Sequence, residues 1–290
     1  MALEHIDRAL TRLQAAGVAS PEADAWHLLS YVTGIQRGEL HARVIAGSLE
    51  FTADVRDRFD QALSRRENRE PLWHITGLAP FLNLELSVGP GVFTPRPETE
   101  LLAQQARTEL ELMPPRDGVI QVVDLCAGSG ALALAIATAS PHAKVLAVEL
   151  SAEAAEYLQS NVSRLAPQSV EIVIGDVAEA AGALAEGSVD LVVSNPPYLV
   201  EGVDQLDEET RESDPDLALF ADEQGFSVID KVISVSSSVL REGGVVLMEH
   251  GIDQAETIHA MLSDRGFARA ETIADLLGRP RFTRAERAPR

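Results

Sequence analysis

The sequence predicts an α/β protein in which a small helical domain precedes a mostly parallel, doubly wound sheet. Three observations lead to this fold class. From residue 119 onward, short aliphatic stretches alternate with segments of helical periodicity, as in sheets with helices on both faces. Residues 1–75 place their apolar residues at helical spacing, and a Gly- and Pro-rich stretch that alternates like a strand follows them.

The composition is that of a folded, acidic protein. With 290 residues, 46% of them hydrophobic, the chain is long enough for one large domain and a smaller one. Its 45 acidic residues outnumber the 24 Lys and Arg residues, which gives a formal net charge of −21. Because so negative a surface repels phosphate backbones, the sequence disfavours a protein that grips long stretches of nucleic acid.

The single cysteine, Cys126, excludes a disulfide framework and fits a reducing compartment. Charged residues near the start, among them Glu4 and Asp7, do not fit a signal peptide, and no apolar run approaches the length of a membrane span. We therefore expect a cytoplasmic protein with no membrane partner and no bound metal.

The N-terminal 75 residues predict a helical bundle. A first helix over residues 2–16 ends at Gly17, Ser20 and Pro21 begin a second helix, and Thr52 caps a longer one. No catalytic constellation is visible in this domain, so we expect it to bind or position a partner. Its Arg-rich segment, residues 56–69, fits a solvated helix face better than a docking face.

The chain divides into three predicted segments: a helical domain (1–75), a β-hairpin linker (76–92) and a large domain (93–290). The hairpin is predicted from the alternating residues 81–88 between flanking glycines. The segment Thr94-Pro95-Arg96-Pro97-Glu98-Thr99-Glu100 then forms a stiff entry to a helix that Pro114 ends near residue 112.

The large domain alternates strands and helices. The predicted strands cover residues 119–125, 144–150, 170–175, 189–193 and 244–248, with two late strands near 268–273 and 281–287. The predicted helices between them cover residues 130–139, 153–165, 225–240 and 254–264.

Ligands of such sheets bind at the carboxyl ends of the strands, and polar residues follow the first three strands. The first strand runs into the glycine-rich loop Asp124–Gly130, where the backbone could approach a ligand closely. Glu149 ends the second strand, where it could accept hydrogen bonds from both hydroxyls of a ribose or simply be solvated. Asp176 follows the third, where it could bind an adenine amino group or cap a helix.

The fourth strand ends at Asn195-Pro196-Pro197-Tyr198. The two prolines hold the backbone extended and remove two N–H donors. The exposed groups are then the Asn195 amide, the Pro196 carbonyl oxygen and the Tyr198 ring, which together could hold a planar NH2 group by two acceptors. In isolation, a bare Asn-Pro pair favours a proline turn at a strand end.

Together, the ordered strand ends resemble the Rossmann-like class I methyltransferases that depend on S-adenosylmethionine. The resemblance narrows to the release factor glutamine methyltransferase family and covers nearly the whole chain. It is carried by the glycine loop, the Asn195–Tyr198 tetrapeptide and four further segments: Pro71 to Phe81, Thr94 to Glu100, Glu249-His250-Gly251, and Asp275 to Arg281.

The resemblance implies methyl transfer from S-adenosylmethionine to a glutamine side-chain nitrogen in peptide chain release factors, a step of translation termination. It implies cofactor-binding residues and a catalytic, substrate-holding set. For the cofactor these are Asp124, Cys126, Ala127, Gly128, Ser129, Gly130, Glu149, Asp176, Val177 and Asn195. For the substrate glutamine they are Asn195, Pro196, Pro197, Tyr198 and Phe81, with Asn195, Pro196 and Tyr198 catalytic.

The sequence departs from the family pattern at three places. The family loop often begins with Gly where this chain has Cys126, and an aromatic often stands where it has Val177. The hairpin around Phe81 lacks a second aromatic, so Phe81 could belong to the core instead. His250 is expected to be structural.

Other functions stay open on the residues alone. A methyltransferase acting on adenine in DNA or on an RNA base would use the same tetrapeptide, but the chain lacks a basic recognition region, and no sequence-specific nucleic-acid binding is expected. Residues 128–133 also fit a dinucleotide pattern, which would suit an NAD-binding oxidoreductase. A non-catalytic cofactor-binding adaptor is a further alternative.

Overall fold

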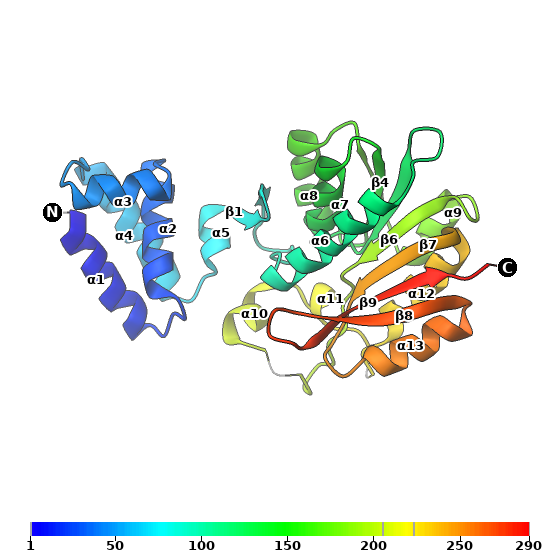
Figure 1. The fold of residues 1–290 in the computed structure, drawn as a ribbon. Coiled ribbons are helices and arrows are strands. Elements are labelled where there is room, and N and C mark those ends of the chain that lie inside the picture. Colours follow the sequence, from blue (N-terminus) through cyan, green and yellow to red (C-terminus); the bar gives the residue numbers. More distant parts are fainter. Residues whose placement is uncertain (1, 205, 223, 290) are drawn as a thin grey trace. The chain divides into compact units, whose positions relative to one another are not determined.

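In the computed structural model, which describes residues 2–204, 206–222 and 224–289, the chain forms two compact units. One comprises Met1–Leu78 and Asp207–Ser213, and the other comprises Ala79–Leu206 and Asp214–Arg290. Each unit has a hydrophobic core of its own. Figure 1 shows the helices of residues 2–76 in blue and cyan and the large sheet of the second unit from green to red.

The first unit is a helical bundle. Its helices are α1 (Ala2–Ala15), α2 (Pro21–Thr33), α3 (Arg37–Ile45), α4 (Ala53–Glu67), α5 (Leu72–Thr76) and the separate α10 (Glu208–Ser213). Helix α2 packs against α1 and α4 around buried residues such as Leu13, Leu29 and Phe59. The three helices predicted from the sequence are confirmed, and the Thr52 hydroxyl accepts from the Val55 N–H as a cap. Ser20 makes no such side-chain bond.

One arginine of the predicted solvated face is buried. Arg66 is 4% exposed; its Nε donates to Asp24 at 2.7 Å and its Nη2 to both oxygens of Glu209 at 2.9 Å. Arg69 also donates to Glu209, at 2.9 Å. These ion pairs explain why α10, far along the chain, groups with the helical unit. The expectation of a solvated face is therefore wrong for Arg66.

The second unit is built on a seven-stranded sheet of order β5-β4-β3-β6-β7-β9-β8. Its strands are β3 (Ile120–Leu125), β4 (Ala143–Glu149), β5 (Val170–Ile174), β6 (Val189–Ser194), β7 (Leu240–Glu249), β8 (Phe267–Ala274) and β9 (Pro280–Arg287). The first five are parallel, while β9 runs antiparallel to both β7 and β8. A separate two-stranded sheet pairs β1 (Leu78–Phe81) with β2 (Leu84–Ser87).

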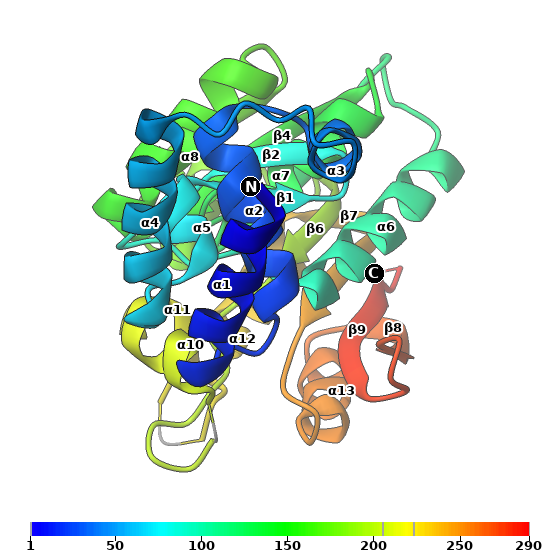
Figure 2. The ribbon, with the colours of Figure 1, turned by 90° about the vertical axis from the view of Figure 1, so that its left-hand side faces the viewer.

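Helices cover both faces of the large sheet. One layer contains α6 (Pro97–Leu112), α7 (Ala131–Ala139) and α8 (Ala152–Leu165), and the other contains α9 (Val177–Ala183), α12 (Ser227–Val239) and α13 (Ala255–Asp264). Figures 1 and 2 show α13 beside β8 and β9. The short α11 (Asp216–Leu219) lies between β6 and α12 in the chain. No helix in the described ranges is long and apolar enough to cross a membrane.

The strand register brings the predicted strand ends to one edge. Leu125 pairs with Ser194, so the glycine loop and Asn195 leave neighbouring strands at the same level. On the opposite side of β3 from β6, Glu149 at the end of β4 pairs with Ile174 of β5. Asp176 follows Ile174 by two residues. Because these strands are parallel, all four polar segments meet at the carboxyl edge of the sheet.

The structure differs from the sequence-based elements at several places. The alternating residues 81–88 do not form one strand, because Leu82 adopts φ 52° and turns the chain between β1 and β2. Strand β7 is longer than predicted. The short helices α5, α9, α10 and α11 were not predicted, since four to seven residues give too little periodicity to detect. The nine-residue α3 was also missed, because it buries only Leu40 and Val44.

Candidate active site

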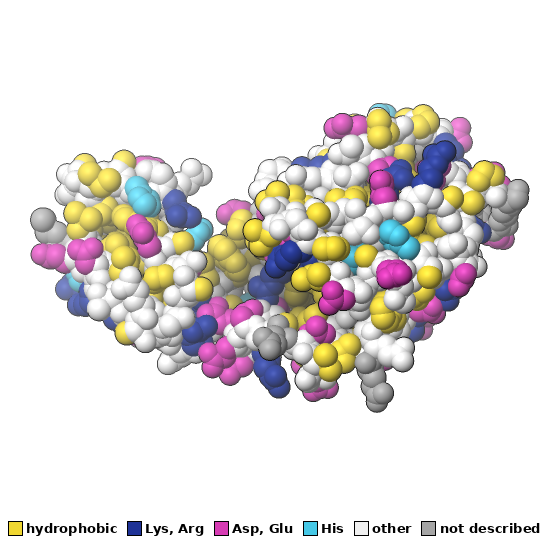
Figure 3. Space-filling view, turned by 60° about the horizontal axis from the view of Figure 1, so that its bottom comes forward, with side chains coloured by type: hydrophobic (Ala, Val, Ile, Leu, Met, Phe, Trp, Pro, Cys, Tyr) yellow, Lys and Arg dark blue, Asp and Glu magenta, His cyan; other side chains and the backbone are white. Residues whose placement is uncertain are grey.

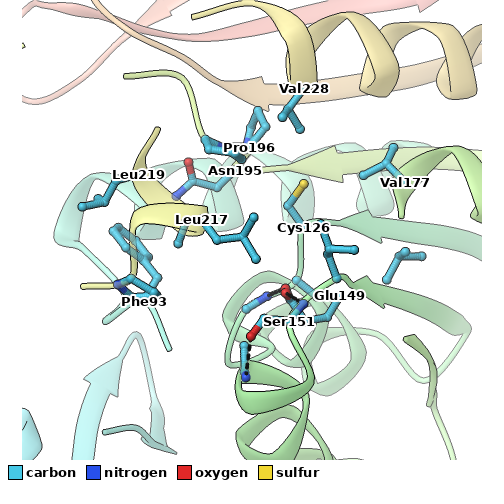
Figure 4. A pocket seen from close by; sticks show the side chains of 18 of the residues that line it. Phe93, Cys126, Glu149, Ser151, Val177, Asn195, Pro196, Leu217, Leu219 and Val228 are labelled. Atoms are coloured by element: carbon cyan, nitrogen blue, oxygen red, sulfur yellow. Dashed lines mark hydrogen bonds between the residues drawn. The ribbon is translucent and has the colours of Figure 1, made fainter. Parts of the chain in front are cut away.

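A cavity of ≈ 310 Å³ opens at the carboxyl edge of the sheet, within the second unit. Figure 4 shows Cys126, Glu149, Ser151 and Val177 on one side of it and Phe93, Leu217 and Leu219 on the other, with Asn195 and Pro196 between. The predicted site residues that line it are Cys126, Ala127, Gly128, Ser129, Glu149, Asp176, Val177, Asn195, Pro196, Pro197 and Tyr198. The cavity therefore has a polar, loop-lined end and an apolar end that meet at the Asn-Pro-Pro-Tyr segment.

The glycine loop needs left-handed backbone conformations. Gly128 has φ 56° and Gly130 has φ 88°, values that cost a side-chain-bearing residue free energy. A Cβ on Gly130 would also lie 2.7 Å from Leu158 Cδ1, so this glycine serves packing and does not line the cavity. Cys126 has φ 65° and adopts the same conformation without being glycine.

Asp124 lies beneath the loop, outside the cavity lining. Its side chain is 0% exposed, and Oδ2 accepts a hydrogen bond of 2.9 Å from the Ala133 N–H at the start of α7. Oδ1 has no partner among the described residues. Burial raises the pKa of Asp124 to about 8. Asp124 does not line the cavity where a cofactor contact was predicted. Its side chain instead connects the end of β3 to the first turn of α7.

Glu149 points its carboxylate at the glycine loop. Oε2 accepts from the Gly128 N–H and Oε1 from the Ser151 N–H, both at 2.7 Å. These bonds fix the side chain, which is buried but lines the cavity. Because each carboxylate oxygen carries two lone pairs, both can accept a second hydrogen bond from a ligand hydroxyl.

Asp176 is the N-cap of α9, the alternative role that the sequence left open. Oδ1 accepts from the Ala178 N–H at 2.8 Å, and Oδ2 from Lys231 Nζ at 2.7 Å. The hydrogen bond from Lys231, followed by that from Ala178, lowers the pKa of Asp176. The carboxylate also lines the cavity beside the buried side chain of Val177. Capping and ligand binding are therefore compatible at this position.

The Asn195–Tyr198 segment leaves β6 in a fixed conformation. The Ser194 hydroxyl donates to the Leu125 carbonyl oxygen at 2.7 Å and ties the end of β6 to β3. Asn195 Nδ2 donates to Thr99 Oγ1 at 3.3 Å. Within the described residues, neither Asn195 Oδ1 nor the Pro196 carbonyl oxygen receives a hydrogen bond. Two acceptors are thus available beside the cavity.

Tyr198 is held through its hydroxyl. Arg281 Nη2 donates to it at 2.6 Å, and the hydroxyl donates to Glu249 Oε1 at 3.3 Å. The guanidinium carbon of Arg281 also lies 5.3 Å from the ring centroid. Burial, with the nearby Glu249 carboxylate, raises the pKa of Tyr198, so the phenol stays protonated and its ring is presented as a fixed wall.

Two predicted residues have other roles. Phe81 is 0% exposed and is not part of the cavity lining, so it belongs to the core and the expectation that it walls a substrate pocket is not met. His250 is fully buried; Nδ1 donates to the Gly251 carbonyl oxygen at 2.7 Å, which leaves Nε2 to accept from Thr283 Oγ1 at 3.0 Å. It is a structural histidine.

The apolar wall comes instead from residues that the sequence did not single out. Phe93 lines the cavity directly before the Thr94–Glu100 segment, and Leu217 and Leu219 reach it from α11. An aromatic just before that segment was the available signal for Phe93. Nothing in the local sequence identifies Leu217 or Leu219, because α11 is only four residues long.

The strand order, the antiparallel β9 and the cavity at the carboxyl edge define a Rossmann-like class I methyltransferase. Residues 4–77 match the family of the PrmC N-terminal domain, and residues 85–210 match the methyltransferase small domain. A T. thermophilus 16S rRNA N2 G1207 methyltransferase, solved with AdoMet and guanosine, superposes with a TM-score of 0.51 at 26% identity, over 72% of this chain and 49% of that one.

Curated relatives narrow the class to one family. A release factor glutamine methyltransferase of Streptomyces coelicolor is 43% identical over 255 residues, which are 87% of this chain and 85% of that protein. The chain belongs to the release factor glutamine methyltransferase family. A 4-amino-L-phenylalanine/4-methylamino-L-phenylalanine methyltransferase of Streptomyces pristinaespiralis is also 37% identical over 259 residues, which are 88% of this chain and 85% of that protein.

Proposed function

We propose that this protein transfers a methyl group from S-adenosylmethionine to the side-chain amide nitrogen of a glutamine in peptide chain release factors. The observation that carries the proposal is the pair of unused acceptors, Asn195 Oδ1 and the Pro196 carbonyl oxygen, beside the cavity. Membership of the family supports the choice of substrate.

The residues at the polar end of the cavity fit S-adenosylmethionine. Glu149 has free acceptor capacity for the two ribose hydroxyls, and Asp176 has it for the adenine amino group, beside the apolar side chain of Val177. Gly128 has open space where a Cβ would stand, so the backbone can approach a ligand. When bound, the cofactor supplies an electrophilic methyl group on a sulfonium.

The chain's own contribution is an amide clamp. A glutamine amide is a poor nucleophile because its nitrogen lone pair is delocalised into the carbonyl. If Asn195 Oδ1 and the Pro196 carbonyl oxygen each accept one amide hydrogen, they fix the nitrogen and favour the positive charge that develops on it. Tyr198 and Phe93 line the space beside the clamp and would hold the amide plane.

The proposed methyl transfer needs no strong base to remove the proton from the amide nitrogen. With the amide nitrogen held by the clamp, the carbon–sulfur bond of a bound cofactor would break with its electron pair going to sulfur, and the nitrogen would form the new carbon–nitrogen bond. The nitrogen then loses one proton to water. Because transfer from a sulfonium is strongly downhill, no buried general base is required, and the clamp oxygens need only accept hydrogen bonds.

A base methyltransferase is the main competing function, since an exocyclic base amine is also a planar NH2. The net charge of −21 opposes binding to a phosphate backbone. On the face shown in Figure 3, basic side chains are scattered among acidic ones and do not form a continuous stripe. These features favour a protein substrate. The relative that acts on 4-aminophenylalanine makes a free aromatic amine a third substrate to test.

The helical unit is proposed to dock the release factor. It has its own core and matches a domain named for this family, and among its described residues we find no catalytic cluster. We place the reaction in the cytoplasm, where release factors act on ribosomes.

A radiolabelled-methyl assay tests the proposal. Release factor, free 4-aminophenylalanine and RNA are offered separately to the wild-type protein and to Asn195→Ala, with S-adenosylmethionine binding measured by calorimetry. We expect label in the release factor alone and its loss in Asn195→Ala. Cofactor binding should persist in that variant, at most modestly weakened, because Glu149 and Asp176 at the polar end of the cavity are intact. Transfer to RNA or to the free amine, but not to release factor, would refute the substrate assignment.

A further inference from the structure

A buried carboxylate is connected to the Asn195 side chain of the clamp and to Tyr198 beside it. Glu249, at the end of β7, is 2% exposed. Its Oε2 accepts from Thr99 Oγ1 at 2.8 Å, and Thr99 in turn contacts Asn195 Nδ2. Its Oε1 contacts the Tyr198 hydroxyl and Arg281 Nη2, at 3.3 and 3.2 Å. Thr99 and Glu249 are 150 positions apart in the chain, so only the fold creates this connection.

The directions of the hydrogen bonds follow from which groups can donate. Burial raises the pKa of Glu249, while the Arg281 guanidinium and the hydrogen bond from Thr99 oppose that shift. Ionised beside Arg281, the carboxylate has only acceptors, so the hydroxyl hydrogen of Thr99 points to Glu249. The Thr99 oxygen can then only accept from Asn195. The Asn195 NH2 group therefore faces Thr99, and its Oδ1 faces away, toward the cavity. Arg281 supplies the positive charge that balances Glu249.

The opposite orientation of Asn195 would change the chemistry of the site. An Asn195 NH2 group turned to the cavity would donate a hydrogen bond, which suits a carboxylate and repels the N–H of an amide. The two orientations have nearly the same shape, so sterics alone cannot select one. Among the described contacts of the Asn195 side chain, only the hydrogen-bond relay from Glu249 through Thr99 distinguishes its NH2 group from its oxygen and so selects one orientation.

We infer that Glu249 and Thr99 are positioning residues that lock Asn195 with its oxygen toward the substrate and thereby make the site select an amide over a carboxylate. This inference rests on the proposed function and deepens it, because it names what distinguishes glutamine from glutamate at the clamp. The same carboxylate accepts the hydrogen bond from the Tyr198 hydroxyl. Glu249 therefore positions both the Asn195 oxygen and the Tyr198 ring.

The test cuts the relay without changing the size of the side chain. Thr99→Val removes the hydroxyl, Thr99→Ser keeps it, and Thr108→Val alters an exposed threonine of the same helix as a control. Steady-state methylation of a purified release factor gives kcat and KM. A release factor whose acceptor glutamine is replaced by glutamate serves as a competitive inhibitor, and its inhibition constant is compared with that KM.

We expect Thr99→Val to lower kcat by about 10- to 100-fold, since a small misplacement of the reacting group costs this much. We also expect the preference for the glutamine form over the glutamate form to fall by about tenfold, the value of a hydrogen bond to a charged group. Thr99→Ser should recover most of the lost kcat and of the lost preference, and cofactor affinity should stay close to wild type in both variants. Thr99→Val should also lower the melting temperature, because the buried Glu249 Oε2 loses its hydroxyl donor, and Thr99→Ser should restore it.

Thr99 lines the cavity and Glu249 does not, so a variant of Glu249 tests the inference without altering the cavity wall. Glu249→Gln can donate to Thr99 and so permits the inverted relay, and we expect the same loss of discrimination from it. Full activity and full discrimination in both Thr99→Val and Glu249→Gln would overturn the inference. Loss that Thr99→Ser does not restore would show a structural role and overturn it too. If the wild-type protein does not methylate the release factor, the proposed function itself fails, which the first measurement reveals.

Discussion

Asn161 of α8 donates its side-chain amide to the carbonyl oxygen of Ser129, 2.9 Å away, and so ties the glycine loop to the helix behind it. The same amide exchanges two hydrogen bonds with the backbone of Ser87 in β2: Nδ2 donates to the carbonyl oxygen at 3.0 Å, and Oδ1 accepts from the N–H at 2.7 Å. Asn161 is fully buried. One side chain thus connects the hairpin to the loop of the cavity.

Removing this connection should weaken the site. Asn161→Ala leaves the backbone groups of Ser87 and the Ser129 carbonyl without their partner, which we expect to cost about 1–3 kcal/mol of stability. We also expect weaker S-adenosylmethionine binding, because the loop loses its support. Calorimetry on this variant and on Gln159→Ala, an exposed position of the same helix, checks both effects. Wild-type affinity in Asn161→Ala would contradict the supporting role.

Cys126 occupies a backbone conformation that favours glycine. At φ 65° its Cβ is strained, and a left-handed residue costs about 1–2 kcal/mol. The Cys126→Gly substitution removes this strain but also removes a packed side chain and frees the unfolded chain. We therefore expect a net change within about 1 kcal/mol, with cofactor binding retained. Cys126→Val, which adds β-branching at the same φ, should be clearly destabilised in a thermal scan; equal stability of the two variants would contradict the strain.

Asp124 should make stability depend on pH. Its pKa of about 8 in the folded protein lies above the ordinary 3.8, because burial disfavours the charged form. Between these pH values the native state holds a proton that the unfolded chain has released. The stabilisation of the native state by this bound proton is therefore fully present below pH 4 and is lost as pH rises through about 8. The free energy of unfolding falls by at most ~1.4 kcal/mol per pH unit from this group.

Asp124→Asn replaces the protonated acid by a neutral group of similar shape. We expect its unfolding free energy to fall less than that of the wild type between pH 5 and pH 8, in urea titrations at each pH. The comparison of slopes cancels the contributions of all other titrating groups. If the free energy of unfolding changes with pH by the same amount in the wild type and in Asp124→Asn, the pKa of Asp124 is not raised.

The helical unit should depend on Arg66. Arg66→Met leaves the buried Asp24 carboxylate without its charge partner, which we expect to cost about 3–5 kcal/mol. The double variant Asp24→Asn/Arg66→Met should recover much of the loss, because no uncompensated charge remains. Both tryptophans, Trp26 and Trp73, belong to this unit, so intrinsic fluorescence follows its unfolding alone. Equal destabilisation in the single and double variants would contradict the ion-pair account.

The sequence predicted the sheet because its strands and long helices have strong periodicity. It also predicted which strand ends meet at the cavity, since Glu149 ends one strand, the Asn195–Tyr198 segment directly follows another, and parallel strands end at one edge. Local order along the chain was enough for both.

Contacts between distant segments could not be predicted in this way. The Thr99–Glu249 bond and the Arg66–Glu209 pair join residues more than 140 positions apart. Burial was equally hidden: Asp124 and Phe81 belong to the right segments, but the fold turns both side chains into the interior. Phe93 lines the cavity from the irregular segment between β2 and α6, where no periodicity marks its side chain.

In the proposed reaction Asn195 holds a glutamine amide of a release factor for methylation, and peptide mass spectrometry identifies the atom that receives the methyl group. A release factor is incubated with S-adenosylmethionine and either the wild-type protein or Asn195→Ala, then digested and sequenced by fragmentation. We predict one methyl group on the side-chain nitrogen of a single glutamine with the wild-type protein and none with the variant. A methyl group on another residue type, or equal methylation by Asn195→Ala, would refute the proposed function.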